Sequence, residues 1–199
     1  MTDDLADRLT IRELIDNWAI YRDSGDWERF RGVWHDGGEI DATWFQGGVD
    51  AFMRASRAGW ENGVKVWHTL GGSSIDISGP RAVAQTRMTI AQRAPVHGIE
   101  CDVVCTGRFY DFLEKRRGEW GFVVRQGIYE KDRIDPVDPA ATLELDRAVL
   151  DRFPEGYRHL AYLQEAAGMT VKIDMPGLHG PEVEALYARG LRWLSGQPI

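Results

Sequence analysis

The middle of the chain contains three long segments whose residue pattern constrains the fold more than any other feature. Each alternates apolar and polar side chains, or is rich in β-branched and aromatic residues, which is typical of β-strands. Short stretches that contain Pro or Gly separate them, as chain reversals require. We therefore expect two consecutive hairpins of one antiparallel sheet. The segments are Arg81–Arg93, Cys101–Leu113 and Trp120–Asp132, with reversals at residues 94–98 and 116–119.

The length of these segments indicates that the sheet is bent. Each spans about ten residues or more, whereas a typical strand has about five or six. A sheet of such long strands is expected to curve strongly rather than lie flat. Its concave face must then be covered by other parts of the chain, and its convex face must also meet something.

The segments before residue 81 predict that cover. A helical stripe of apolar residues fills residues 3–23, and Ser24 or Asp26 can cap a second short helix. The adjacent glycines Gly71 and Gly72 predict a bulge or bend in an extended stretch. We expect an α+β fold in which the helices lie on one face of an antiparallel sheet. The expected elements are helices at 27–34 and 51–59, a short strand at 39–45, and extended segments at 64–70 and 73–78.

The character of the chain changes after Asp132. Pro136 and Pro139 cannot donate backbone hydrogen bonds, so they argue against a continuing central strand. We place a boundary here and divide the chain into a domain at residues 1–135 and a C-terminal helical extension at residues 136–199. Helices are expected at 140–153, 157–167 and 181–194. The extension should pack back on the domain or on a partner subunit.

Composition limits the classes of partner. The chain has 199 residues, 24 basic and 31 acidic side chains, and a net charge of −7. This balance argues against nucleic acid and against an anionic membrane surface. Because no apolar run approaches the roughly 18 residues of a membrane span, and the N-terminus is polar, we expect a cytoplasmic protein. Cys101 and Cys105 lie four apart in one predicted strand and are interpreted as buried thiols.

The sequence shows no metal or cofactor motif. The five histidines are scattered, and His97, Glu100 and Asp102 are the only place where ligand-type residues crowd together. They lie at a predicted hairpin tip, where solvated charges are normal, and a metal site needs three or four convergent ligands. We therefore expect neither a metal nor a cofactor.

His68 is the histidine that the strand pattern turns inward. It shares a face with Val66 and Leu70, so its imidazole would lie in an apolar wall and need a polar partner. Asp23, at the end of the first helix, is the candidate, and such a pair could act as a base near neutral pH. In the alternative interpretation His68 is a satisfied core histidine and Asp23 pairs with Arg22 or caps a turn.

Arg125 and Tyr129 share a face of the last long strand, because they lie four residues apart. If that face is concave, Arg125 is a buried cation that needs an acid or an anionic substrate. If it is convex, both residues belong to the surface or to an interface. The pattern alone does not choose between the two.

Three stretches of the chain resemble the SnoaL-like branch of the nuclear transport factor 2-like superfamily. They are IRELIDNWAIYRDSGDWERFRGVWHDGGEID, WHTLGG and RGEWGFVVRQGIYEKD. The resemblance covers Leu5 to about Asp132 and implies a cone-shaped α+β fold with a pocket inside its bent sheet. The Gly71-Gly72 pair and the long C-terminal extension depart from the pattern of that small core.

The resemblance also implies roles for particular residues. In members that resemble scytalone dehydratase and hexachlorocyclohexane dehydrochlorinase, an Asp at the end of the first helix pairs with a His that removes a proton from the substrate. Asp23 and His68 match those positions, and Arg125 matches a pocket arginine of the dehydrochlorinase. We did not match the second histidine or the tyrosines of scytalone dehydratase.

Together these observations predict a cofactor-independent lyase or isomerase that acts on a small hydrophobic, cyclic molecule. The alternative is a non-catalytic binding protein or a scaffold similar to a dioxygenase β subunit, since the fold hosts both. A homodimer or higher oligomer is expected because the outer register of the last strand is apolar, although the extension could cover it instead. That register is Trp120, Phe122, Val124 and Ile128; the expected catalytic residues are Asp23 and His68, and the expected substrate-binding residues are Trp18, Tyr21, Trp44, Arg108, Arg125 and Tyr129.

Overall fold

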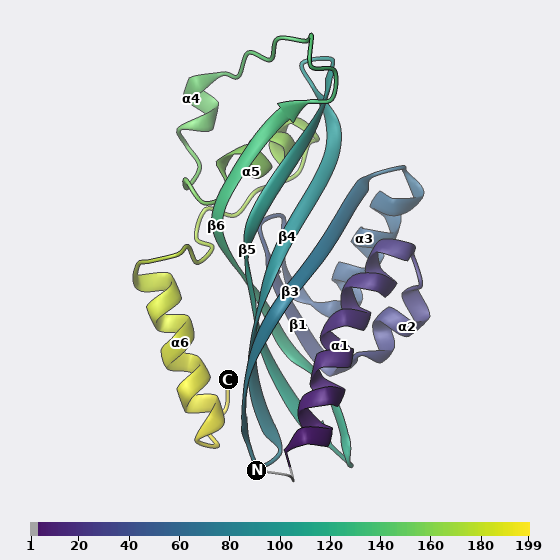
Figure 1. Ribbon diagram of the computed structural model, residues 1–199, viewed down its shortest axis with the longest axis vertical. Helices are drawn as coiled ribbons and strands as arrows, with labels where there is room; N and C mark the ends of the chain where they lie inside the picture. The colour runs from purple at the N-terminus through teal and green to yellow at the C-terminus, as the bar shows by residue number, and fades with distance from the viewer. Residues whose placement is uncertain (1–3) are drawn as a thin grey trace.

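The computed structural model describes residues 4–199 and builds them around one six-stranded sheet, in the order β2-β1-β6-β5-β4-β3. Figure 1 shows the long, strongly twisted sheet with α1, α2 and α3 on one side and α6 on the other. The predicted α+β class and bent sheet are confirmed. The elements are α1 Leu5–Ser24, α2 Trp27–Gly32, β1 Trp34–Ala42, β2 Phe45–Gly48, α3 Val49–Glu61, β3 Lys65–Ser78, β4 Arg81–Val96, β5 Ile99–Arg116, β6 Glu119–Pro136, α4 Arg147–Leu150, α5 Arg158–Ala166 and α6 Pro181–Leu194.

The two predicted hairpins form, and their strands are longer than predicted. β4 and β5 pair up to Val96 opposite Ile99, and β5 and β6 pair from Arg116 opposite Glu119. The prediction that Pro136 excludes a continuing strand was wrong, because β6 reaches Pro136, which lies opposite Cys101. A proline at the last residue of a strand interrupts no further ladder hydrogen bond, so it ends the strand without shortening it.

The first strand differs most from the prediction. It begins at Trp34 instead of Glu39, pairs with β6 in parallel, and is followed by a separate short strand, β2, that pairs with it antiparallel. Trp34 packs on Phe122 with ring centroids 5.1 Å apart. This burial draws the chain into the sheet directly after α2, whose N-terminus is capped by Asp26 as predicted.

Two irregularities in the ladders decide which side chains face inward. One lies between Leu70 and Ser73, where Gly71-Gly72 predicted it. Another lies between Phe112 and Leu113 of β5, where the pairing with β6 slips by one residue: Phe112 is opposite Val124 and Leu113 is opposite Phe122. As a result, the predicted outer register of β6 is split. Trp120 and Phe122 belong to the core under the N-terminal helices, whereas Val124 and Ile128 belong to the cluster on the opposite face.

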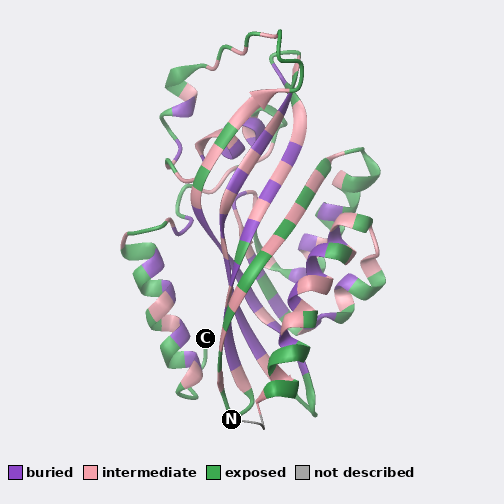
Figure 2. Ribbon diagram, in the orientation of Figure 1, coloured by how far each residue is buried: buried purple, intermediate pink, exposed green. Residues whose placement is uncertain are grey.

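Helix α6 covers that opposite face within the same chain. Its buried stripe, Val183, Leu186 and Trp193, packs against Val124 and Ile128, and Figure 2 shows the buried residues of α6 in a stripe along the helix. Leu191 of the same helix lies on its outer side and is 71% exposed. This cover removes much of the apolar surface that suggested a dimer, so the oligomeric state stays a prediction.

The rest of the extension closes the other end of the sheet. Asp132 of β6 accepts hydrogen bonds from the backbone N–H groups of His159 and Leu160, and so fixes the start of α5. The predicted helix at 140–153 was wrong, since only α4, Arg147–Leu150, is helical. Asp146 caps it, so the helix begins only after that residue. No helix between residues 4 and 199 has the length and apolarity that crossing a bilayer would need.

Candidate active site

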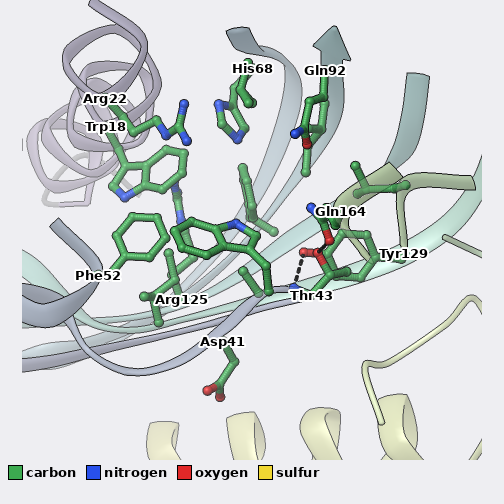
Figure 3. A pocket seen from close by; sticks show the side chains of 17 residues that line it. Trp18, Arg22, Asp41, Thr43, Phe52, His68, Gln92, Arg125, Tyr129 and Gln164 are labelled. Carbon is green, nitrogen blue, oxygen red and sulfur yellow. Dashed lines mark hydrogen bonds between the residues drawn. The ribbon is translucent and has the colours of Figure 1, made fainter. Parts of the chain in front are cut away.

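A cavity lies inside the concave face of the sheet, under α1 and α3 and beside α5 (Figure 3). It holds about 510 Å³ of empty space, including the part that opens to solvent. Most of its wall is apolar and aromatic. The apolar wall includes Trp18, Ile40, Trp44, Phe52, Phe109 and Leu160.

His68 lines this cavity and is hydrogen-bonded to Asp23. The Nδ1 atom of His68 lies 2.8 Å from Oδ1 of Asp23, and the backbone N–H of His68 donates to Oδ2 at 2.6 Å. With Nδ1 bound to the carboxylate, Nε2 is the nitrogen left to accept a proton from a ligand. The predicted hydrogen bond between the two residues is therefore present.

Local sequence explains why the two residues meet. Gly25 takes a left-handed conformation, with φ of 74°, and ends α1 directly after the turn that carries Asp23. On β3, the two-residue period turns Val66 and His68 toward the cavity and leaves Trp67 49% exposed. Trp18 lies five residues before Asp23 on the same helix. Its ring meets the His68 ring edge to face, with the ring centroids 5.2 Å apart.

Burial and charge set the protonation of the pair. Burial lowers the pKa of His68 below its ordinary value; the Asp23 hydrogen bond and charge oppose this effect, and the positive charges of Arg22 and Arg125 add to it. Burial opposes ionisation of Asp23, but its bonds to His68 outweigh burial, and the pKa of Asp23 is lowered. At neutral pH His68 is therefore a neutral base beside a carboxylate.

Arg125 faces the concave side, which answers the question that the pattern left open. Its guanidinium is fully buried and forms two hydrogen bonds with Asp111 of β5, at 2.7 and 2.8 Å. It also lies 4.3 Å from the ring centroids of Trp18 and Phe109. Within the described part of the chain, its Nη1 atom has no hydrogen-bond partner. Burial raises the pKa of Asp111, and Arg125 counters that effect.

Tyr129 also lines the cavity and is held by the extension. Its hydroxyl accepts a long hydrogen bond, 3.4 Å, from the backbone N–H of Thr43. The Thr43 hydroxyl donates to Oε1 of Gln164, a residue of α5, at 2.8 Å. Burial raises the pKa of Tyr129, so its hydroxyl stays protonated at neutral pH.

Five polar residues of the wall were missed by the sequence analysis: Arg22, Asp41, Thr43, Gln92 and Gln164. Figure 3 shows the side chains of Arg22, Gln92 and Gln164 pointing toward the cavity, whereas that of Asp41 extends away from it. The strand period could have identified Gln92, because it lies two residues from Ile90 on β4. Arg22 had been considered only as a partner of Asp23, to which its Nη1 donates at 3.4 Å. Gln164 could not be placed, because nothing in the sequence shows where α5 docks.

Two of the predicted substrate-binding residues lie outside the cavity. Arg108 is on the other face of the sheet and bonds to Glu130 and to Tyr187 of α6. Its strand alternates faces, and Phe109 is the neighbour that turns inward. Tyr21 packs at the edge of the core, where Arg29 lies 5.7 Å from its ring. The other four, Trp18, Trp44, Arg125 and Tyr129, all line the cavity.

His97 and Asp102, near the turn between β4 and β5, make contacts that hold the fold together. His97 lies 2.7 Å from the hydroxyl of Tyr162 on α5, and Asp102 pairs with Arg93 on the neighbouring strand. Among residues 4–199, no three His, Cys, Asp or Glu side chains converge as a metal site would require. Cys101 and Cys105 are free and buried, as predicted.

The bent sheet, its helical cover and the internal cavity define a nuclear transport factor 2-like protein. The SnoaL-like domain family matches residues 3–126, so the chain belongs to that family. It is similar to pea pathogenicity protein 2 of Fusarium vanettenii, at 42% identity over 97% of this chain and 88% of that protein. An uncharacterised protein of Emericella nidulans, AN9274, is 35% identical over the same shares.

Solved structures with the same fold have low sequence identity. A scytalone dehydratase-like protein from Novosphingobium aromaticivorans has a TM-score of 0.58 at 19% identity and covers 72% of this chain and 100% of its own. Hexachlorocyclohexane dehydrochlorinase LinA-type3 from Novosphingobium barchaimii has a TM-score of 0.56 at 18% identity, over 72% of this chain and 98% of its own. At these identities the similarity shows the fold alone.

The C-terminal extension is shared by the relatives and not by the family pattern. The SnoaL-like match ends at Gln126, before α4, α5 and α6 begin. The Fusarium relative, in contrast, matches 97% of the chain. Helix α5, which brings Leu160 and Gln164 to the cavity, therefore lies outside the part of the chain that matches the family model.

Proposed function

We propose that the protein is a cofactor-independent lyase or isomerase that removes a proton from carbon in a small hydrophobic, cyclic substrate. The observation that carries the proposal is the position of His68, which is bonded to Asp23 in the wall of an aromatic cavity. In this role Nε2 of His68 takes the proton. A neutral imidazole is needed for that step, and the lowered pKa of His68 keeps it neutral at pH 7.

Asp23 would orient the base and stabilise its charged form. Its two hydrogen bonds to His68 fix the ring and the tautomer that exposes Nε2. When the imidazole becomes positive, the adjacent carboxylate offsets that charge in a site with little water. Without the carboxylate of Asp23, a positive charge on His68 would be unfavourable because Arg22 and Arg125 are also positive.

Arg125 is suited to stabilise the negative charge that develops on the substrate when the proton leaves. Its Nη1 donor has no partner among the described residues, and its charge lies in the same cavity wall as His68. Electrostatic stabilisation by such a fixed group favours a transition state in which negative charge develops on an oxygen or a leaving group. The aromatic rings around it select an apolar molecule.

The reaction balances without a further reagent. In an elimination the C–H bond breaks, its proton moves to Nε2, and its electron pair forms a C=C bond while the leaving group departs with the electrons of its own bond; protonated His68 returns the proton to a departing hydroxide, which gives an alkene and water. In an isomerisation no group leaves: the C–H electron pair is delocalised onto a neighbouring C=O or C=C bond, and protonated His68 returns the proton to another carbon of that conjugated system. Scytalone dehydratase-like and dehydrochlorinase neighbours share the fold, and their names describe eliminations of this class.

Hydrogen–deuterium exchange tests the proton transfer without knowledge of the substrate. Cyclic ketones such as cyclohexanone, indanone and β-tetralone have acidic protons next to the carbonyl and would fit an aromatic cavity. In deuterated buffer, the wild-type protein should accelerate exchange at those carbons, as followed by proton NMR or mass spectrometry. Replacing the base, His68→Gln, should remove the acceleration, since acid–base catalysis contributes about 10² to 10⁴ in rate.

A histidine outside the cavity provides the matched control. His159→Gln should leave the exchange rate within about twofold of wild type, because His159 is hydrogen-bonded to Asp132 and does not line the cavity. Binding of the ketones without any acceleration would contradict the proposal. It would favour the alternative of a non-catalytic binding protein or a scaffold similar to an oxygenase β subunit.

A further inference from the structure

A second compartment adjoins the catalytic cavity. It lies between α3, the start of β3 and the segment after α5, and holds about 420 Å³ of empty space, including the part open to solvent. Residues that line only this compartment are small or apolar. They include Ala55, Gly59 and Trp60 of α3, Val64, and Met169. We call it the outer compartment and the cavity with His68 the inner compartment.

The two compartments share part of their walls. Five residues line both: Arg22, Trp44, Val66, Gln92 and Gln164. Because they share these residues, the two compartments lie next to each other, on opposite sides of the same side chains. Trp44 is half-buried between them and packs on Phe52 at 5.3 Å. Seen from His68, the outer compartment lies on the α3 side of these shared side chains.

The outer compartment contains a buried hydroxyl without a hydrogen bond. Ser56, which is 4% exposed, lines it, and its Oγ has no partner among residues 4–199. Arg22 lines it too, and its Nε atom is likewise buried without a partner in the described chain. Buried polar groups are normally hydrogen-bonded, so two such atoms on one wall point to a ligand that supplies an oxygen.

The C-terminal extension completes this compartment. Gln164 belongs to α5 and Met169 follows it, and both lie beyond Gln126, where the match to the SnoaL-like family ends. Relatives that share the full length of this chain, such as the Fusarium protein, share that segment. A compartment built partly from a group-specific segment is where specificity within a family with a common fold is expected.

We propose that the outer compartment is a substrate subsite for a second ring that carries an oxygen. The substrate is then a two-ring molecule: the ring that loses its proton lies beside His68, and the second ring lies against Ala55 and Gly59 with its oxygen at Ser56 or Arg22. The assignment of the reacting ring to the inner compartment rests on the proposed function. The subsite itself rests only on the cavity and its polar atoms.

Three phenolic probes measure the subsite directly by binding, with no need for turnover. Phenol fills one compartment, para-phenylphenol adds an apolar second ring, and para,para′-biphenol adds an oxygen to that ring. Their affinities are measured by titration calorimetry on the full chain. We expect para-phenylphenol to bind the wild-type protein at least about tenfold more tightly than phenol, and biphenol to bind more tightly still.

Two variants measure separately what the second ring and its oxygen contribute to the affinity. Gly59→Leu fills the outer compartment; a Cβ at Gly59 meets only Val64 at 3.7 Å, so the helix accepts it. It should abolish the advantage of the two-ring probes and leave phenol unchanged. Ser56→Ala should remove only the preference for biphenol over para-phenylphenol, about a fivefold effect for one hydrogen bond. Ala58→Leu, on the exposed side of the same helix, is the matched control and should change nothing.

The results separate failure of the subsite from failure of the function. Equal affinity of phenol and para-phenylphenol for the wild-type protein would overturn the subsite, and so would equal losses for both probes in Gly59→Leu. No binding of any probe would overturn it as well. Because the probes report binding and the exchange test reports proton transfer, a protein that fails the deuterium-exchange test can still contain the subsite.

Discussion

Asp23 accepts two hydrogen bonds from His68, one from the backbone N–H and one from Nδ1. The same arrangement occurs a second time, between Asp132 and His159. The second pair anchors the start of α5 on β6 and lies outside the inner compartment. The geometry of an Asp–His pair is therefore no sign of catalysis by itself. What distinguishes His68 is an aromatic cavity, a neighbouring Arg125 donor that has no partner among residues 4–199, and a side chain that is only 7% exposed.

The first prediction concerns the pKa of His68. In the wild-type protein it should lie below the ordinary value of about 6.5, since burial dominates. Asp23→Asn should lower it further, because the carboxylate is the partner that raises it. Titration of the imidazole by NMR measures both values. An unchanged His68 pKa in Asp23→Asn would show that the carboxylate does not act on the imidazole.

The second prediction concerns stability against pH. Because the pKa of His68 is lowered on folding, the unfolded chain binds a proton that the folded chain does not, so stability decreases as pH falls below about 6.5. The lowered pKa of Asp23 acts in the same direction at more acidic pH: its contribution is present above about pH 4 and is lost as pH falls through the folded pKa. Urea unfolding at several pH values should show both declines. His68→Gln should remove the upper one, and retention of the upper decline in that variant would assign it to another group.

The sequence predicted the class of fold because its strongest patterns are local. Alternation, turns with Pro or Gly, and the helix stripe ending near Asp23 each depend on neighbouring residues. It did not predict the partner of Arg125, although Asp111 is its direct neighbour across the second hairpin. Counting back from the turn, where Arg116 pairs with Glu119, places Tyr110 opposite Arg125; the register shift between Phe112 and Leu113 moves the partner to Asp111.

Other features could not be read from local patterns. The bulge opposite Phe112 and Leu113 moves Trp120 and Phe122 to the inner face, and it depends on how three strands and the N-terminal helices pack together. Docking of α5, which brings Gln164 to the cavity, depends on Asp132 and on contacts more than a hundred residues apart in sequence, such as that with Thr43. Such long-range contacts leave no period in the sequence.

The third prediction concerns the buried Arg125–Asp111 pair. Asp111→Ala removes both charge-assisted bonds and leaves a buried, unpaired cation, so it should reduce the free energy of unfolding by about 3–5 kcal/mol. Arg93 and Asp102 form a matched pair on β4 and β5 that is about one-third exposed on each side, at 34% and 38%. Asp102→Ala should therefore reduce stability by at most about 1 kcal/mol. Urea unfolding at pH 7 compares the two, and equal losses would mean that Arg125 reaches solvent or another partner.

The fourth prediction concerns the contact between α6 and the sheet. A Cβ at Gly190 would overlap the hydroxyl of Tyr110, so Gly190→Ala should push α6 away from the convex face and destabilise the protein by about 1–3 kcal/mol. Tyr110→Phe removes the overlapping oxygen. In that background the same glycine replacement should have a smaller effect, and a double-mutant cycle of unfolding free energies measures the difference. Additive losses in the cycle would show that α6 approaches the sheet through other side chains, and that Gly190 matters only through its backbone.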